Sequence, residues 1–145
     1  MNLGQMLEET CQRYPEHVAV ISEDRPFPYS VLNDAVNALG NALRELGAKK
    51  EDKIAIVLHN CPEFVISYFA AQKIGTVAVT LNTASTAHEL QYLLVNCEAR
   101  ILITTASNAA RYESILDKVP LCRHVIVTDR TEPAVPASPD ASDFW

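Results

Sequence analysis

The order of hydrophobic and polar residues predicts a strand, a helix and a second strand between Ile54 and Asn82. Ile54 to Leu58 is an unbroken apolar run, which is typical of a strand covered on both faces. Pro62 suits a first helical position, because its missing N–H would be unpaired there. Apolar residues surround the whole helix, so we expect it to be largely buried and to end at Gly75 in a left-handed conformation. We therefore predict parallel strands joined by a right-handed crossover.

The first 50 residues predict a helix, a hairpin and a second helix. One helical face carries the apolar residues Leu3, Met6, Leu7, Cys11 and Tyr14, and Pro15 ends that helix. Val18–Ser22 and Phe27–Tyr29 resemble two short strands that turn at Glu23-Asp24-Arg25-Pro26. Ser30 is expected to cap the next helix, whose apolar positions keep the 3.6-residue period, and Gly47 closes it. The charged segment Lys49 to Asp52 is interpreted as a solvent-exposed loop that leads into the central unit.

Beyond Asn82 the pattern predicts two more helices and two more strands. Thr86 and Glu89 form a capping box at the start of one helix. Ile101–Thr104 is the third strand of the predicted sheet; a weaker helix carries Tyr112, Ile115, Leu116 and Val119, and Val125–Val127 is the fourth strand. The segment from Asp129 to Asp143 is rich in proline, serine and aspartate and is interpreted as a linker.

These elements predict an α/β fold with a parallel sheet flanked by helices. We expect residues 1–128 to form one unit, with a helix-hairpin-helix portion over 1–50 and a β/α sheet portion over 51–128. Residues 129–145 are expected to be a linker or a truncated tail, because Phe144 and Trp145 resemble the start of another packed element.

Composition narrows the function classes. A chain of 145 residues is long enough for one core, and its net charge of −6 argues against nucleic acid as a partner. No apolar segment approaches the length of a membrane span. The acidic start MNLGQMLEE does not resemble a secretory signal, so we expect a cytoplasmic chain. Four widely spaced cysteines are most simply buried thiols in a reducing compartment: Cys11, Cys61, Cys97 and Cys122.

Three segments together resemble the N-terminal part of the adenylate-forming enzymes, which include acyl-CoA synthetases, luciferases and peptide-synthetase adenylation domains. Phe27 to Leu32 (FPYSVL) is similar to the family's L-T/S-Y-x-E-L core, and Asp52 to Phe64 to its G-D-R-V-A-I-L-L-P-N-S-P-E-F segment. Ala71 to Asn82 is similar to L-K-A-G-A-V-A-V-P-L-N-P. The similarity continues in register to about residue 128, and within the family the sequence is most similar to fatty- or aryl-acid CoA ligases.

The resemblance implies that this chain forms only part of the N-terminal domain of the adenylate-forming enzymes, the ANL-type domain. Threonines stand at two positions where the family usually has proline (Thr80 and Thr83), and Val31 replaces its core glutamate. The family's phosphate loop T-S-G-T-T-G-x-P-K, its Y-G-x-T-E segment, its T-G-D aspartate and its late lysine have no counterpart in this sequence. A full-length relative is thus expected to use ATP, Mg²⁺ and CoA, whereas this chain is expected to be an inactive N-terminal fragment without catalytic, cofactor-binding or metal-binding residues.

Several polar groups invite a functional interpretation that a structural one outweighs. The turn Thr104 to Asn108 follows a strand and could favour a phosphate, but it lacks glycine and lysine, so helix capping is the better interpretation. Leu58-His59-Asn60 and Leu81-Asn82-Thr83 follow strand ends, where open α/β sheets place ligands. We expect surface or structural roles for the four histidines His17, His59, His88 and His124, and solvated positions for the adjacent acids Glu8-Glu9 and Glu23-Asp24. We expect Phe64, Tyr68 and Phe69 to pack in the core.

Three hypotheses remain open on the sequence alone. The chain is a fragment that works as part of an acyl-CoA ligase, a stand-alone nucleotide- or acyl-binding module, or an interaction protein with an exposed sheet edge. The carboxylic-acid substrate and the remainder of the enzyme are the expected partners of the first. Unpaired edge strands also predict that the isolated chain self-associates.

Overall fold

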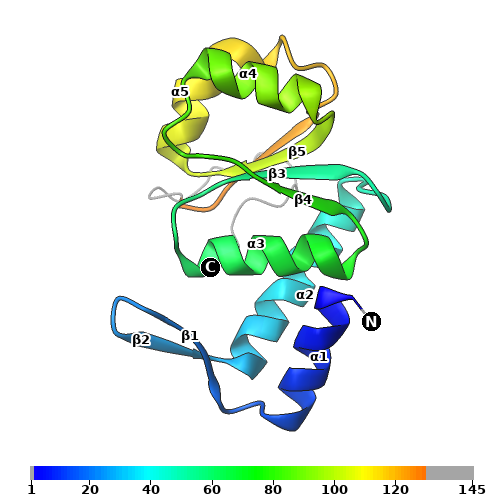
Figure 1. Cartoon of the computed structure of the whole chain (residues 1–145), viewed down its shortest axis with the longest axis vertical. Coiled ribbons are helices and arrows are strands. Elements are labelled where there is room, and N and C mark those ends of the chain that lie inside the picture. Colours follow the sequence, from blue (N-terminus) through cyan, green and yellow to red (C-terminus); the bar gives the residue numbers. More distant parts are fainter. Residues whose placement is uncertain (1, 130–145) are drawn as a thin grey trace.

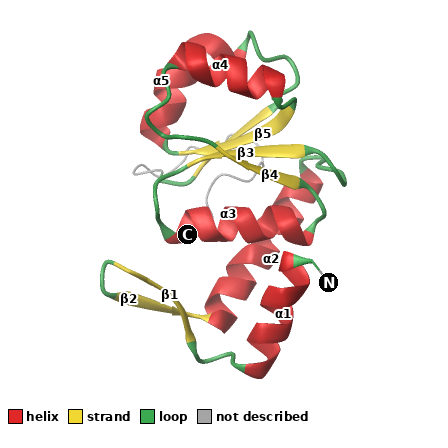
Figure 2. Cartoon of the chain, viewed as in Figure 1, coloured by secondary structure: helices red, strands yellow, loops and turns green. Residues whose placement is uncertain are grey.

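A four-stranded parallel sheet with the strand order β4-β3-β5-β6 forms the centre of the molecule. The structure is a computed structural model that describes residues 2–129. The strands are β3 (Lys53–Val57), β4 (Val77–Thr80), β5 (Ala99–Thr104) and β6 (His124–Val127). The helices α3 (Pro62–Lys73), α4 (Ala87–Asn96) and α5 (Ala106–Leu116) connect them (Figure 2). The predicted parallel α/β sheet is confirmed.

Helices cover both faces of this sheet (Figure 1). The side chains of Ile54, Ile56 and Ile103 join the cluster that includes α3, while Ala55, Val57 and Leu102 join the cluster that includes α4 and α5. Every residue from Ile54 to Leu58 is buried, as the apolar run predicted. Because helices bury both faces of the sheet, only its two edge strands, β4 and β6, are left without a neighbour on one side among the described residues.

The N-terminal portion packs on the outer side of α3. Helix α1 (Leu3–Arg13) contacts both α2 (Tyr29–Glu45) and α3, and the antiparallel hairpin of β1 (Val18–Ser22) and β2 (Arg25–Pro28) lies before α2. In Figure 1 the hairpin projects from the lower part of the molecule, away from the parallel sheet. Residues of α1, α2 and α3 share one buried cluster with the sheet, so both predicted portions contribute to the same core.

Local signals at helix ends were mostly confirmed. Thr86 and Glu89 form the capping box of α4, and Gly47 and Gly75 have φ angles of +88° and +79° after α2 and α3. Ser30 is not the N-cap of α2: the helix begins at Tyr29 with Pro28 as N-cap and no side-chain hydrogen bond. The prediction failed because hairpin bonds determine this junction; the N–H groups of Tyr29 and Ser30 donate to carbonyl groups across the hairpin base.

The hairpin turn of the N-terminal portion differs from the prediction, and the structure adds how far α1 is buried. The hairpin turn is only Glu23-Asp24, both with positive φ, so Arg25 and Pro26 belong to β2. The apolar face of α1 is only partly covered: Leu7 is buried, but Leu3, Met6 and Tyr14 remain among the exposed large hydrophobic residues. α1 packs mainly against α2 and α3, so the apolar residues that lie outside this contact remain exposed to solvent.

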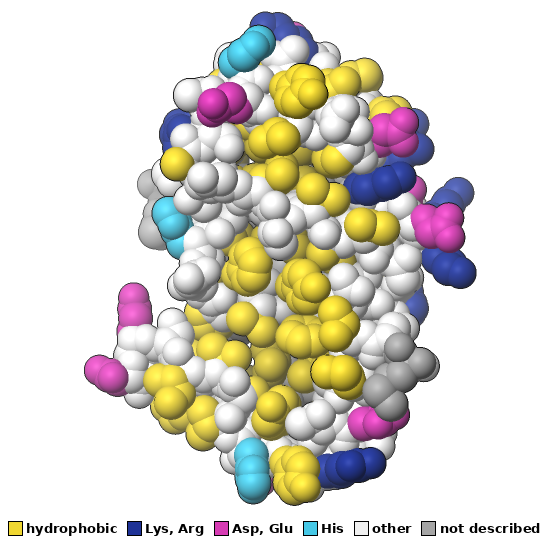
Figure 3. Space-filling model, viewed as in Figure 1, with side chains coloured by type: hydrophobic (Ala, Val, Ile, Leu, Met, Phe, Trp, Pro, Cys, Tyr) yellow, Lys and Arg dark blue, Asp and Glu magenta, His cyan; other side chains and the backbone are white. Residues whose placement is uncertain are grey.

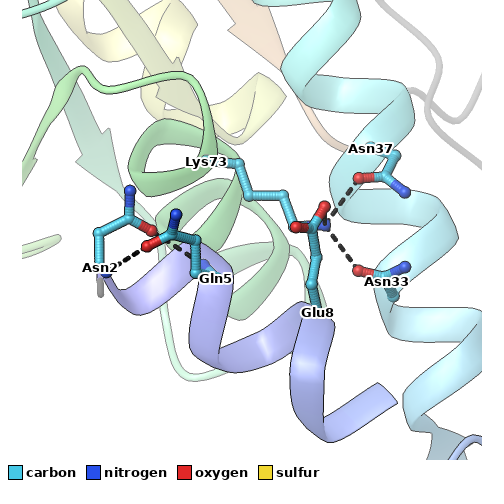
Figure 4. A network of polar contacts seen from close by, with 6 residues as sticks. All are labelled: Asn2, Gln5, Glu8, Asn33, Asn37 and Lys73. Carbon is cyan, nitrogen blue, oxygen red and sulfur yellow. Dashed lines mark hydrogen bonds and ion pairs between the residues drawn. The ribbon is translucent and has the colours of Figure 1, made fainter. Parts of the chain in front are cut away.

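One buried ammonium group joins the three helices α1, α2 and α3 (Figure 4). The Nζ of Lys73 donates to Glu8 Oε1 at 3.0 Å, Asn33 Oδ1 at 2.7 Å and Asn37 Oδ1 at 2.8 Å. The side chain of Lys73 is only 10% exposed. Glu8 therefore forms a structural ion pair, whereas the sequence predicted only a solvated position for it; its side chain is still 51% exposed. Within residues 2–129, no helix is long and apolar enough to cross a bilayer.

Candidate functional site

The carboxyl ends of the four parallel strands lie together along one side of the sheet, called the carboxyl edge to distinguish it from the edge strands β4 and β6. The segments that follow them are His59-Asn60 after β3, Asn82-Thr83 after β4, Thr105 after β5 and Thr128-Asp129 after β6. Open α/β sheets bind ligands outside this edge, which makes it the candidate site of the chain. The sequence prediction had selected the first three of these segments.

The loops after β3 and β4 contact each other at this edge. The Nδ1 of His59 lies 3.4 Å from the hydroxyl oxygen of Thr83, a hydrogen bond whose direction depends on the imidazole tautomer. Asn82 turns its amide oxygen inward on its own loop and accepts the N–H of Ala84 at 2.9 Å. The structure thus brings together two residues that lie 24 positions apart, and it uses Asn82 to shape the loop.

Arg111, which no sequence pattern had singled out, holds the loop after β4 against α5. Its guanidinium donates to the carbonyl oxygens of Ser85 at 3.0 Å and Thr83 at 3.4 Å, and to Asn108 Oδ1 at 3.3 Å. The hydroxyl of Tyr112 donates to the same Ser85 carbonyl at 3.1 Å. The bonds between loop and helix span 26 to 28 residues, so no local pattern could have revealed them.

The hydroxyl-rich turn Thr104 to Asn108 is used for capping, as predicted. Thr104 donates to the carbonyl of Val57 at 2.9 Å, and Thr105 accepts the N–H of Asn108 as the N-cap of α5. The carboxylate of Asp129 accepts the N–H of Ala106 at 2.5 Å. The chain therefore places its own anion at the amino end of α5, where helix N–H groups favour negative charge.

These residues do not fit a triphosphate or a metal ion. No lysine or glycine lies in the turn before α5, and Asp129 already occupies its first free N–H. Across residues 2–129 no group of three or more His, Cys, Asp or Glu side chains could hold a metal. Phe64, Tyr68 and Phe69 pack against the core, in agreement with the structural interpretation. Among the described residues, the edge contains no arrangement of nucleophile, base or metal ligands from which a reaction step could be built.

The four cysteines are free and half-buried, so they are less buried than predicted. Burial raises the pKa of Cys61 to about 11 and that of Cys122 to about 11, because desolvation penalises the thiolate. Burial also raises the pKa of Cys97. Cys61 is the N-cap residue of α3, yet it makes no side-chain capping bond there. A thiol held in its neutral form is a poor nucleophile or metal ligand.

An open groove of about 770 Å³ borders the carboxyl edge on the side of α4. It runs from the loop after β4 along the exposed face of the helix, and its lining is Asn82, Ala84, Ser85, His88, Glu89, Gln91, Tyr92, Leu93 and Val95. The lining is mainly apolar and contains no lysine or arginine. The groove can accept an apolar surface more readily than an anion.

Comparison with known families identifies what this scaffold is part of. The model of the family described as AMP-binding enzyme matches residues 7–144. The chain belongs to the AMP-binding enzyme family. This assignment confirms the predicted resemblance to adenylate-forming enzymes.

Named relatives of this AMP-binding chain are acid–CoA ligases. It is 32% identical to the crotonobetaine/carnitine–CoA ligase of Escherichia coli over 149 aligned positions, which cover 99% of this chain and 28% of that ligase. The corresponding ligase of Salmonella paratyphi A is 34% identical over 79% of this chain and 23% of its own length. The chain thus spans about a quarter of the length of these relatives and corresponds to an N-terminal AMP-binding portion.

Solved structures of AMP-binding enzymes show the same fold. The anthranilate CoA ligase AuaEII superimposes with a TM-score of 0.83 at 29% identity, over 88% of this chain and 25% of that one. A fatty acyl CoA synthetase of Mycobacterium tuberculosis gives 0.82 at 28% identity, over 88% and 26%. The N-terminal domain of FACL13 from the same organism gives 0.83 at 27% identity; the match covers 98% of this chain and 40% of that domain.

Proposed function

We propose that this chain supplies the N-terminal scaffold of an acyl-CoA synthetase that activates a fatty or aryl acid. The full-length enzyme would join the acid to ATP, with Mg²⁺, as an acyl adenylate and then transfer the acyl group to CoA. The observation that carries the proposal is the match to AMP-binding enzymes over residues 7–144, together with relatives named as acid–CoA ligases. The names of the solved relatives support the fatty- or aryl-acid class.

In this proposal the chain alone has no ligase activity. Its strand-end loops are shaped by contacts within the chain, and the start of α5 carries Asp129 in place of a phosphate. The rest of the enzyme is its main partner, residues 1–128 are the scaffold unit, and the site of action is the cytoplasm. The linker predicted for residues 129–145 lies, apart from Asp129, outside the residues that the structure describes. Self-association through an exposed sheet edge is a second, separate property of the chain in isolation.

Two measurements test the proposal. Purified chain is incubated with ATP, Mg²⁺ and a panel of fatty and aryl acids, and pyrophosphate release is followed; we expect no turnover. The chain is then fused to the C-terminal three-quarters of the E. coli crotonobetaine/carnitine–CoA ligase in place of the matched segment. Thioester formation by the fusion supports the scaffold role, whereas acyl adenylate formed by the chain alone would contradict it.

A calorimetric titration separates the scaffold from a stand-alone binding module. ATP and a non-hydrolysable fatty acyl adenylate analogue are titrated into the chain. We expect no saturable heat, because the turn before α5 lacks lysine and glycine and its helix end already holds the Asp129 carboxylate. Tight binding of either ligand by the chain alone would favour the module.

A further inference from the structure

Strand β4 forms one edge of the parallel sheet and pairs on one side only. The N–H groups of Val77 and Leu81 donate to the carbonyl oxygens of Asp52 at 2.8 Å and Ile56 at 2.9 Å, toward β3. Alternate residues of a strand direct their main-chain groups to opposite sides, so those of Ala78 and Thr80 point away from β3. Within residues 2–129 no other strand pairs with them.

This edge lacks the devices by which proteins usually protect an edge strand. Natural edges carry lysine, proline or a bulge. The sequence of β4, Val77-Ala78-Val79-Thr80, has neither charge nor proline, and its register with β3 has no shift. Val77 is 44% exposed. By contrast, the hairpin strand β2 carries Pro26 and Pro28. At the other edge of the parallel sheet, β6 also lacks lysine and proline, but none of its four residues is exposed, so β4 is the more accessible edge.

Apolar surface continues from β4 onto α4. Tyr92 and Val95 are 66% and 51% exposed, and both line the groove that begins at Asn82, just beyond β4. Figure 3 shows hydrophobic side chains gathered over the middle of the face on which β4 lies in Figure 1, with most charged side chains toward its margins. The uncharged strand edge, with the exposed Tyr92 and Val95 beside it, has the apolar and aromatic composition of an interface core, and the charged Glu89 lines the same groove.

We propose that β4 pairs antiparallel with β4 of a second copy of this chain, which extends the two sheets into one of eight strands. The strand is complementary to itself in this arrangement. The outward groups set Ala78 opposite Thr80 of the other copy and Val79 opposite Val79 on the two-fold axis, with no charge facing a like charge. An axis along the sheet normal keeps both α4 helices on the same side, so their exposed apolar residues meet.

Charges at the two ends of β4 favour the same orientation. Lys50 lies at its amino end, where a Cβ on Gly75 would stand 3.4 Å from Lys50 Cγ. Glu89 lies beyond its carboxyl end, and hydrogen bonds from Thr86 lower the pKa of its carboxyl group, which keeps it charged. Antiparallel pairing brings Lys50 of one copy toward Glu89 of the other. Neither residue forms an ion pair with any described residue of its own chain.

Sedimentation of the 145-residue chain tests the proposal. Between about 5 and 500 µM, the range of weak transient interfaces, we expect a monomer–dimer equilibrium. Val77→Lys should raise its dissociation constant about tenfold or more, because it puts a lysine on each apolar edge strand, opposite Leu81 of the other copy, as natural edge strands use lysine to block pairing. Ile21→Lys is the matched control: it adds the same charge at the hairpin, on a residue that is 70% exposed, and should leave the dissociation constant unchanged.

A cross-linking experiment tests the geometry independently of stability. Val79→Cys should form an intermolecular disulfide under mild oxidation, because the two copies of residue 79 face each other as a non-hydrogen-bonded pair about 4.5 Å apart between Cα atoms. Wild type and Ile21→Cys, which retain the four native cysteines, should not cross-link at a comparable rate. A chain that stays monomeric and uncross-linked overturns the proposal and makes the rest of an AMP-binding domain the occupant of this edge. Equal weakening by Val77→Lys and Ile21→Lys also overturns it. None of these outcomes depends on ligase activity.

Discussion

Replacement of Lys73 by methionine is the sharpest test of how the N-terminal helices are held to the sheet. The ammonium group of Lys73 makes three hydrogen bonds of 2.7 to 3.0 Å to Glu8, Asn33 and Asn37, from a side chain that is 10% exposed. Methionine keeps most of the unbranched aliphatic stem and removes the charge. The substitution therefore tests the polar contacts and leaves the packing of α3 largely in place.

The expected cost of Lys73→Met is about 2 kcal/mol. A hydrogen bond to a charged group contributes about 1.5–3 kcal/mol, but three bonds to one ammonium are not additive. The loss is reduced because the buried ammonium no longer has to be desolvated. It is reduced further because Glu8 is 51% exposed, so water can replace the lysine at its carboxylate.

Urea unfolding measures this loss. We expect the midpoint to fall by about 1 M with an unchanged m value. Hydrogen exchange should show that the amides of α1 lose more protection than those of β3, because Lys73 contacts α1 and α2 directly. The control is Lys118→Met, at an exposed lysine without an ion pair to any described residue, which should change stability by less than about 0.5 kcal/mol. The reasoning is refuted if Lys73→Met costs no more than this control, or if Lys73→Met and Asn33→Ala prove additive in a double-mutant cycle.

Further substitutions and a labelling experiment test other parts of the chain. Gly4→Ala should destabilise the fold by about 1–3 kcal/mol in thermal unfolding, because the new Cβ would lie 2.8 Å from the Cα of Lys73. An exposed helical Gly→Ala change normally stabilises, so an unchanged or raised stability would contradict the close approach. Thr86→Ala should cost about 1 kcal/mol through the lost cap of α4, whereas Thr86→Ser should retain most of it; equal losses would dismiss the cap. Alkylation of Cys61 and Cys122 at pH 8 should be about 100-fold slower in the folded chain than in urea, since burial raises each pKa from 9.0 to about 11, and should accelerate as pH rises. The same raised pKa values imply stability that is present below pH 9 and is lost as pH rises from 9 toward 11; a flat profile there would count against them.

The sequence alone was sufficient for elements whose signals are local. The run Ile54 to Leu58, the proline at the start of α3 and the glycine after it placed the βαβ unit, and Thr86 with Glu89 placed α4. Such signals succeed because they act within one turn or one strand. The ordered series of segments from Phe27 to Val127 also identified the family, which no single segment would have done.

Tertiary contacts decided the features that local signals could not. The sequence placed the apolar residues of α1 on one helical face, but of its large apolar residues only Leu7 is buried, because the width of a covered face depends on the neighbours available. Ser30 lost its expected capping role to the hydrogen bonds of the hairpin base. Arg111 acquired its partners from a loop 26 to 28 residues away, and Lys73 from helices 36 to 65 residues away.

The difference between what the sequence predicted and what only the structure showed has one physical cause. Hydrophobic periodicity, capping and glycine conformation depend on neighbours within a few residues, so the sequence by itself determined the α/β class, the order of the elements and their family. Strand order, the covering of each helix face and the contacts at the strand ends depend on which distant segments come together. Only the tertiary structure showed that β4 is an edge, that Lys73 joins three helices and that the candidate site is shaped by the chain's own side chains.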